Sequence, residues 1–231
     1  MDMALDVSDA HHRTIGLAAV SVGTPTVLAD SEGATVWSAI RKTRVAPGTT
    51  LWLSNVNLAG DGQADLAVHG GPDKAVYAYP SEHLAAWSAE LGRALGPASF
   101  GENLSTLGAS EASVCIGDVW SWGEATLEVC QPRWPCFKLA LHLGRSDIQQ
   151  RLRRRGRTGW YLRVLEPGAV PADGPIEVVR HDPAGLSVAD AHAAMTDRHL
   201  DRIDLVTALA AHERLAAEWR EPLRERLSRK G

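Results

Sequence analysis

The sequence predicts a mainly β protein of the α+β class, in which a β-barrel with flanking helices is followed by a small C-terminal domain of three helices. Short runs rich in β-branched and aromatic residues recur from residue 13 to residue 180, with Pro and Gly between them. Segments with apolar residues at helical spacing interrupt these runs near residues 81 and 146. After residue 183 alanine and leucine recur at helical spacing. We therefore expect two domains, residues 1–182 and 183–231.

The composition excludes several classes of function. The 231 residues are 45% hydrophobic and 23% charged, and the formal net charge of -4 gives no electrostatic reason to bind nucleic acid or an anionic membrane. No apolar run approaches the roughly 20 residues of a membrane helix. The acidic N-terminus also lacks the basic start and apolar core of a signal peptide. We therefore expect a cytoplasmic protein that uses neither nucleic acid nor a membrane as a partner.

Predicted strands alternate with turns in the first part of the chain. They cover residues 13–23, 34–40, 43–45 and 51–56, and Pro47-Gly48 forms the turn before the last of them. Lys42 and Arg44 alternate about Thr43, so their side chains would share one face of a strand. Taken alone, this pair favours a solvated strand edge over a binding surface.

Residues 58–74 form a long connection that is dense in glycine and polar side chains. Leu66 and Pro72 stand where a calcium loop needs its turn glycine and bidentate glutamate, and the Gly-Lys-Ser/Thr of a phosphate loop is absent. Long structured loops in compact domains are more often functional than not. Gly70-Gly71 permits close approach of the backbone to a ligand, whereas His69 alone is equally well explained as a core or turn histidine.

The later elements follow the same two periodicities. A helix should run from Pro80 to about Leu95, and Ser146 should cap an arginine-rich helix that ends at Gly156. Further strands are expected over residues 76–79, 119–122, 125–131, 160–165 and 176–180, and the three tail helices over residues 187–195, 203–211 and 213–227. The arginines of the capped helix fit a solvated face, because cations near a helix C-terminus complement the macrodipole.

The octapeptide at residues 131–138, Gln-Pro-Arg-Trp-Pro-Cys-Phe-Lys, follows a predicted strand end, where scaffolds often present catalytic loops. Arg133, Lys138 and the helix that Cys136 would begin are features that lower a thiol pKa. Free cysteines are also among the most buried residues, so the octapeptide alone gives a functional and a structural thiol equal weight. Cys115 and Cys130 are interpreted as structural, because three cysteines form neither a disulfide framework nor a zinc site at this spacing.

Four motifs in order resemble those of one family. They are Ala59-Gly-Asp-Gly-Gln-Ala-Asp, His69-Gly-Gly-Pro-Asp-Lys, Phe100-Gly-Glu-Asn-Leu and the octapeptide. Their order and spacing, together with the tail, resemble the MOSC family, the molybdenum cofactor sulfurase C-terminal domain proteins, and its YiiM-like branch. The resemblance extends over roughly residues 14 to 228. It implies a β-barrel that holds molybdenum cofactor, which is molybdopterin with a molybdenum ion.

The resemblance also implies roles for individual residues. Cys136 is the expected protein ligand to the metal, which fits a soft molybdenum centre. Lys and Arg side chains and the exposed backbone of glycine suit the phosphate and the polar pterin of the cofactor. The expected cofactor-binding residues are Lys42, Arg44, Gln63, Asp65, Gly70, Gly71, Glu102, Asn103, Arg133 and Lys138. His69 is the expected acid, which would protonate the amine nitrogen of the substrate during the reaction described below. Pyridoxal phosphate is not an expected cofactor.

The branch is associated with reducing N-hydroxylated compounds (hydroxylaminopurine-type base analogues, amidoximes and hydroxylamines) to amines, with detoxification as the role. This implies a small-molecule substrate and a separate flavin or iron-sulfur reductase as electron donor, because three scattered cysteines are too few for a cluster in the chain itself. The apolar tail also allows a homodimer. Two alternatives stay open: a non-catalytic carrier of molybdenum cofactor or sulfur, and a metal-free enzyme with Cys136 as nucleophile and His69 as base.

Overall fold

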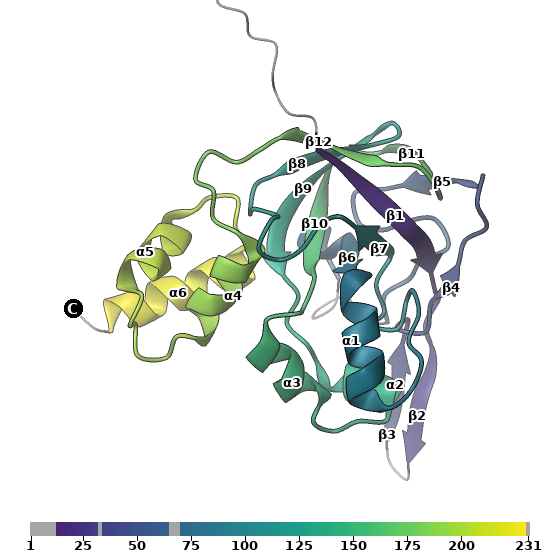
Figure 1. Ribbon diagram of the computed structural model, residues 1–231, viewed down its shortest axis with the longest axis horizontal. Coiled ribbons are helices and arrows are strands. Elements are labelled where there is room, and N and C mark those ends of the chain that lie inside the picture. Colours follow the sequence, from purple (N-terminus) through teal and green to yellow (C-terminus); the bar gives the residue numbers. More distant parts are fainter. Residues whose placement is uncertain (1–12, 32–33, 65–69, 230–231) are drawn as a thin grey trace, which may run out of the picture.

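Seven strands close into a mixed β-barrel in the computed structural model, which describes residues 13–31, 34–64 and 70–229 (Figure 1). Around the barrel the order is β12-β8-β9-β10-β6-β7-β1, and β1 returns to pair with β12. The strands are β1 (Arg13–Val22), β6 (Val76–Pro80), β7 (Leu104–Leu107), β8 (Val119–Trp122), β9 (Ala125–Pro132), β10 (Trp160–Glu166) and β12 (Ile176–Arg180). Only β6 and β7 pair in parallel; the six other pairings of the barrel are antiparallel. The predicted barrel is therefore confirmed.

Further short strands lie outside the closed ring of seven strands. They are β2 (Thr26–Ser31), β3 (Ala34–Ser38), β4 (Thr43–Arg44), β5 (Thr50–Leu53) and β11 (Gly168–Pro171). β2 and β3 form a hairpin, β4 extends β1, and β5 pairs with β11. Sequence analysis missed β2, β7 and β11. β11 consists of Gly-Ala-Val-Pro, whose first and last residues are typical of turns, and β7 has the polar Ser105 and Thr106 at its centre.

The barrel interior is filled by aromatic and aliphatic side chains. Trp120 and Trp160 pack edge to face with their ring centroids 6.0 Å apart, and Trp122 is also fully buried. Such side chains each bury roughly 150–250 Å² and dominate the energetics of a core. A second apolar cluster lies outside the barrel, where Tyr79 stacks on Phe100 at 4.5 Å beneath the helices. This second cluster fixes the helices that carry one wall of the site.

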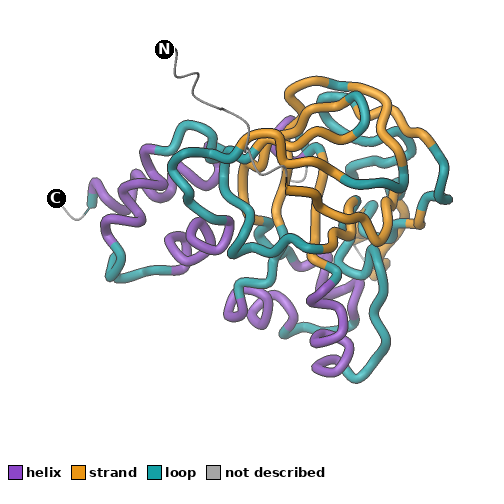
Figure 2. Tube along the Cα trace, turned by 45° about the horizontal axis from the view of Figure 1, so that its top comes forward, coloured by secondary structure: helices purple, strands orange, loops and turns teal. Residues whose placement is uncertain are grey.

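Three helices cover one end of the barrel, and three more lie to its side (Figure 2). The first group is α1 (Glu82–Leu91), α2 (Phe137–Leu143) and α3 (Ile148–Arg155), with a 3-10 turn, η1 (Pro72–Lys74), before β6. α1 ends at Gly92, which takes the left-handed conformation with φ 67°. The prediction that this helix reaches about Leu95 is therefore wrong, because a left-handed glycine terminates it first.

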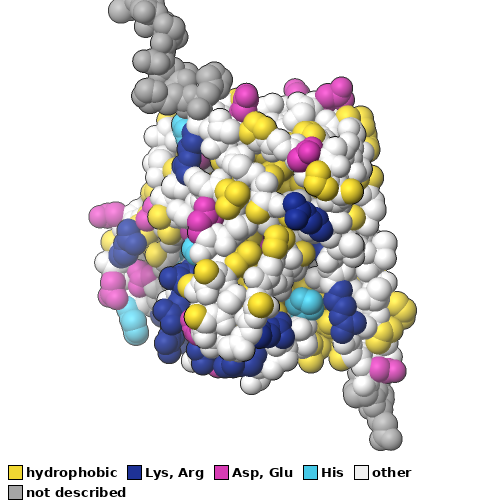
Figure 3. All heavy atoms as spheres, turned by 45° about the vertical axis from the view of Figure 1, so that its right-hand side comes forward, with side chains coloured by type: hydrophobic (Ala, Val, Ile, Leu, Met, Phe, Trp, Pro, Cys, Tyr) yellow, Lys and Arg dark blue, Asp and Glu magenta, His cyan; other side chains and the backbone are white. Residues whose placement is uncertain are grey.

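The arginine-rich helix α3 packs on α1 through ion pairs. Arg151 lies 2.7 Å from Glu90 and also 2.7 Å from Asp147, and Arg155 lies 3.2 Å from Glu90. Residues 153–155 are exposed, and Lys and Arg side chains gather along the lower edge of the face seen in Figure 3. The N-cap residue is Asp147 rather than the predicted Ser146, and the Asp147 side chain makes no capping hydrogen bond to the helix. Gly156 ends the helix as predicted.

The tail forms the three predicted helices, α4 (Val188–Thr196), α5 (Ile203–Ala211) and α6 (Ala217–Ser228). Ser187 begins α4 through a capping box, in which its hydroxyl accepts from the backbone N–H of Asp190 at 3.0 Å. Val188, Leu209 and Trp219 belong to the same buried cluster as the barrel core. The apolar core is thus continuous, and the division into two domains stays a prediction. None of the helices in the described part of the chain has the length and apolar composition that crossing a membrane requires.

Candidate active site

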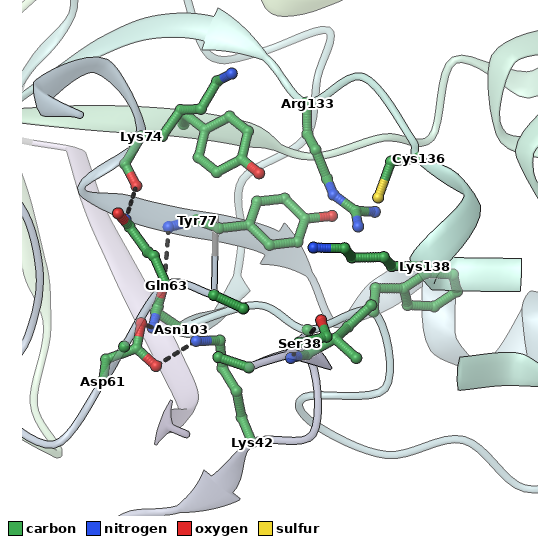
Figure 4. Close-up of a pocket in the computed structure, with 17 residues that line it drawn as sticks. Ser38, Lys42, Asp61, Gln63, Lys74, Tyr77, Asn103, Arg133, Cys136 and Lys138 are labelled. Atoms are coloured by element: carbon green, nitrogen blue, oxygen red, sulfur yellow. Dashed lines mark hydrogen bonds and ion pairs between the residues drawn. The ribbon is translucent and has the colours of Figure 1, made fainter. Parts of the chain in front are cut away.

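A pocket of about 620 Å³, including its open mouth, lies where loops from several strands meet (Figure 4). Its lining comes from six segments that are far apart in the sequence. The residues are Ser38, Ala39, Ile40, Lys42, Asp61, Gly62, Gln63, Ala64, Lys74, Tyr77, Phe100, Gly101, Asn103, Arg133, Cys136, Lys138 and Tyr161. Apolar side chains and a few convergent polar groups line the pocket together, as is typical of pockets for small ligands.

Cys136 occupies the start of α2, as predicted. Its backbone is extended, with φ -107° and ψ 170°, and its carbonyl accepts the N–H of Leu139 at 3.1 Å. The thiol is half-buried and its sulfur points toward the Arg133 guanidinium (Figure 4). The structure therefore presents this thiol to the pocket rather than to the core.

Arg133 is a buried cation in the pocket wall. Its guanidinium lies over the Tyr77 ring, 4.9 Å from the centroid, and its backbone N–H donates to the Gly159 carbonyl at 3.1 Å. Burial acts to lower the pKa of Arg133, but Tyr77, Tyr161 and Cys136 act in the other direction, and the net pKa is raised. Burial also raises the pKa of both tyrosines, so their phenols stay neutral beside a permanent positive charge.

A network around Asp61 fixes the opposite wall. Lys42 and Asp61 form an ion pair with side chains only 7% and 6% exposed. Asp61 also accepts from the backbone N–H of Gly23 at 2.8 Å and from Asn103 Nδ2 at 2.9 Å, and Asn103 Oδ1 accepts from the N–H of Tyr77 at 3.1 Å. Burial lowers the pKa of Lys42, although Asp61 acts to raise it. Lys42 thus lines the pocket with its charge already compensated.

Glu102 shapes the pocket from behind its wall. Its carboxylate accepts from the N–H of Ala98 at 2.7 Å, the N–H of Phe100 at 3.0 Å and the hydroxyl of Ser105 at 2.9 Å. Burial raises the pKa of Glu102, and these hydrogen bonds act to lower it. They hold the turn at Gly101, whose φ of 78° favours glycine and which lines the pocket.

Glu102→Gln is expected to destabilise the fold by about 1–3 kcal/mol, because either orientation of the amide turns its NH2 group toward a buried donor. Urea unfolding of the two proteins measures this difference. The control is Glu225→Gln, at a side chain 68% exposed on α6, which should stay within about 0.5 kcal/mol of the original protein. Equal unfolding midpoints for both variants would contradict the role given to Glu102.

The structure gathers six of the expected residues around this pocket, namely Lys42, Gln63, Asn103, Arg133, Cys136 and Lys138. Gln63 Nε2 donates to the Lys74 carbonyl at 3.3 Å. Other expected residues lie elsewhere. Arg44 is exposed on β4, and Gly70 and Gly71 lie outside the lining, as does Glu102. Asp65 and His69 lie outside the described residues, so their expected roles stay predictions.

Several lining residues were missed by sequence reasoning. Tyr77 and Tyr161 lie in strands, where an aromatic residue is typical of a core, and Lys74 ends a turn without a distinctive pattern. Lys74 Nζ lies 2.5 Å from Glu218 Oε2 on α6. The one available signal for Lys74 was its place in the His69-Gly-Gly-Pro-Asp-Lys motif.

The other two thiols lie away from the pocket lining. Cys130 is buried and its Sγ donates to the Asp73 carbonyl at 3.1 Å, and burial raises its pKa. Burial, followed by the charge of Asp118, raises the pKa of Cys115 to about 11. Both are therefore poor thiolates at neutral pH.

The donor set fits a metal that arrives with its own organic ligand. In the part of the chain that the structure describes, no three His, Cys, Asp or Glu side chains lie close enough to hold a metal ion by themselves. The pocket instead offers one thiol together with Arg133 and Lys138, whereas Lys42 and Lys74 are paired with Asp61 and Glu218. A soft sulfur ligand beside such cations suits an anionic cofactor that supplies the remaining metal ligands.

Several known proteins are similar to this chain in sequence or in fold. A family model described as the MOSC domain matches residues 65–177. The uncharacterized protein YflK of Bacillus subtilis (strain 168) is 42% identical over 174 residues, covering 74% of this chain and 77% of YflK. Protein YiiM of Escherichia coli (strain K12) is 47% identical over 146 residues, 62% of this chain and 64% of YiiM.

A Gibberella moniliformis protein named reductase is 32% identical over 154 residues, which are 65% of this chain but 27% of the fungal protein. The crystal structure of YiiM from Geobacillus stearothermophilus has a TM-score of 0.76 at 32% identity and covers 92% of this chain and 99% of that one. MOSC domains are associated as a family with molybdenum cofactor binding. The chain belongs to the MOSC domain family, in its YiiM-like branch.

Proposed function

We propose that the protein binds molybdenum cofactor in this pocket and reduces N-hydroxylated compounds to amines, as a detoxifying oxidoreductase. One observation carries the proposal: Cys136 points into a pocket beside the buried Arg133 guanidinium. A soft metal ligand and a permanent cation side by side match a metal held by an anionic cofactor. The name of the fungal relative supports reductase chemistry in the family.

In this proposal the pocket residues divide the binding between them. Cys136 Sγ ligates the metal, Arg133 and Lys138 bind the anionic part of the cofactor, and Gln63 hydrogen-bonds a polar edge. When bound, the cofactor supplies the two-electron chemistry that cleaving an N–O bond requires. The reaction consumes two electrons and two protons and converts R–NH–OH into R–NH2 and water.

The protein supplies orientation, exclusion of water and a proton. Phe100 and Ile40 give the pocket apolar wall, and the neutral Tyr77 and Tyr161 phenols pack beside Arg133. We assign the proton for the amine nitrogen to His69, because an unperturbed histidine titrates near operating pH. The electrons come from a separate flavin or iron-sulfur reductase, since three cysteines are too few for a cluster that takes four thiolates.

The experiment is turnover by protein made in a host that synthesises the cofactor. Purified protein is analysed for molybdenum and then supplied with an artificial electron donor and 6-hydroxylaminopurine or benzamidoxime. We expect the substrate to disappear with formation of one amine per N-hydroxyl group consumed. Protein that carries molybdenum but turns over neither compound would favour the carrier alternative, and protein without molybdenum would refute the proposal.

A further inference from the structure

Two consecutive residues in the first turn of α6 contact two different segments that contribute residues to the pocket. Glu218 pairs at 2.5 Å with Lys74, which is one of the residues that line the pocket. Trp219 packs edge to face against Trp134, with ring centroids 5.6 Å apart and planes at 75°. Trp134 stands two residues before Cys136. The tail therefore reaches both the turn that carries Lys74 and the loop that carries the thiol.

The loop with the thiol is clamped between the tail and α3. On the tail side, the His192 ring of α4 lies 6.2 Å from the Trp134 ring. On the other side, the Arg153 guanidinium lies over Trp134 at 5.5 Å, and Gln149 Nε2 donates to the Pro135 carbonyl at 3.2 Å. Trp134 is thus the point at which two groups of helices meet the loop.

The tail side of this clamp is the fixed side. Trp219 is 2% exposed within the continuous core, whereas Trp134 is 40% exposed. The backbone N–H of Ala216 donates to the Cys130 carbonyl at 2.9 Å, which ties the start of α6 to β9. Because β9 leads into the loop, the loop and its aromatic support are fastened to the same strand. The ring of Trp134 packs against a buried side chain that the tail provides.

From these contacts we propose that the C-terminal helices position the loop that carries Cys136, with Trp219 as a positioning residue that holds this loop through Trp134. The identity of the ligand rests on the function proposed above, but the clamp itself does not. The clamp gives the C-terminal helices a role in the site that the sequence motifs do not reveal. Loss of the aromatic contact should let the loop open and expose Cys136 more often.

The first test measures how fast iodoacetamide alkylates Cys136 in full-length, metal-free protein at one fixed pH. Trp134→Leu should raise the rate about two- to tenfold, because the loss of one aromatic pair should make the open loop more populated by that factor. Trp134→Phe keeps an aromatic ring on Trp219 and should react like the original protein. Trp219→Leu, on the other side of the contact, should accelerate the reaction as Trp134→Leu does. Peptide mapping resolves the three cysteines.

The matched control is Trp52→Leu, at a tryptophan 55% exposed on β5 outside the pocket lining, which should leave the rate unchanged. The buried Cys130 is an internal reporter, because its alkylation would reveal global unfolding. Acceleration confined to Cys136 supports the clamp. Rates equal to the original protein in both leucine variants, or equal acceleration by Trp134→Phe and Trp134→Leu, would overturn it.

A second readout concerns the ligand. In protein loaded with molybdenum, Trp134→Leu should lose the metal about two- to tenfold faster during dialysis, while Trp134→Phe should retain it. If even the original protein takes up no molybdenum, the proposed function fails, and the alkylation rates still decide whether the tail positions the loop. Faster alkylation without faster metal loss would overturn the part of the inference that makes the tail a component of the ligand site.

Discussion

Cys136→Ser is expected to lower the molybdenum content of protein made in a cofactor-competent host on the order of 100-fold or more, a larger loss than removing an indirect partner of a metal site causes. The thiol is half-buried and points into the pocket beside Arg133 (Figure 4). A serine hydroxyl at the same place remains protonated at neutral pH and is a hard oxygen donor, whereas a thiolate suits a soft metal centre. Elemental analysis of purified protein, as molybdenum per chain, measures the effect.

The control for this experiment is Cys115→Ser. Cys115 lies outside the pocket lining, and its pKa is raised to about 11, so its replacement should leave the molybdenum content unchanged. Cys136→Ser protein that keeps its full metal content would refute the ligand role. Full metal content together with lost turnover would instead favour a catalytic role for Cys136 other than metal ligation, such as that of a nucleophile.

The fold was largely predictable because most barrel strands carry the β-branched and aromatic residues typical of buried strands. β9 and β10, for example, lie where their composition places them. β7 escaped because Ser105 and Thr106 are polar and yet buried, and because its parallel pairing with β6 depends on residues far away in the sequence. The end of α1 was misplaced because the apolar spacing continues past Gly92, where the backbone takes the left-handed conformation.

The pocket was predictable only where a motif carried it. Arg133 and Cys136 stand in one octapeptide, so their proximity follows from the sequence. Glu102 also stands in a motif, but the structure uses its carboxylate to hold backbone N–H groups and places it outside the lining. No local pattern could show that Glu218 reaches Lys74 or that Trp219 supports Trp134, because these contacts arise from how the tail packs on the barrel.

Arg133→Ala is expected to lower retention of molybdenum on the order of 10- to 100-fold, because it removes a buried cation that would hold the anionic cofactor by directed hydrogen bonds. The guanidinium is held over the Tyr77 ring and is always charged. Arg133→Lys keeps the charge but loses the planar fork, so its retention should fall between those of the alanine variant and the original protein. The half-time of molybdenum loss during dialysis measures all three.

Arg154→Ala is the matched control, because Arg154 is exposed on α3 and lies outside the pocket lining. Its stability should change by less than about 0.5 kcal/mol and its molybdenum retention should not change. Thermal unfolding of metal-free protein separates a lost ligand contact from a weakened fold: Arg133→Ala protein that stays folded but empty supports a binding role. Equal molybdenum retention in the two alanine variants would show that the buried and the exposed arginine contribute equally to cofactor binding. Arg133 would then have no specific role in holding the cofactor.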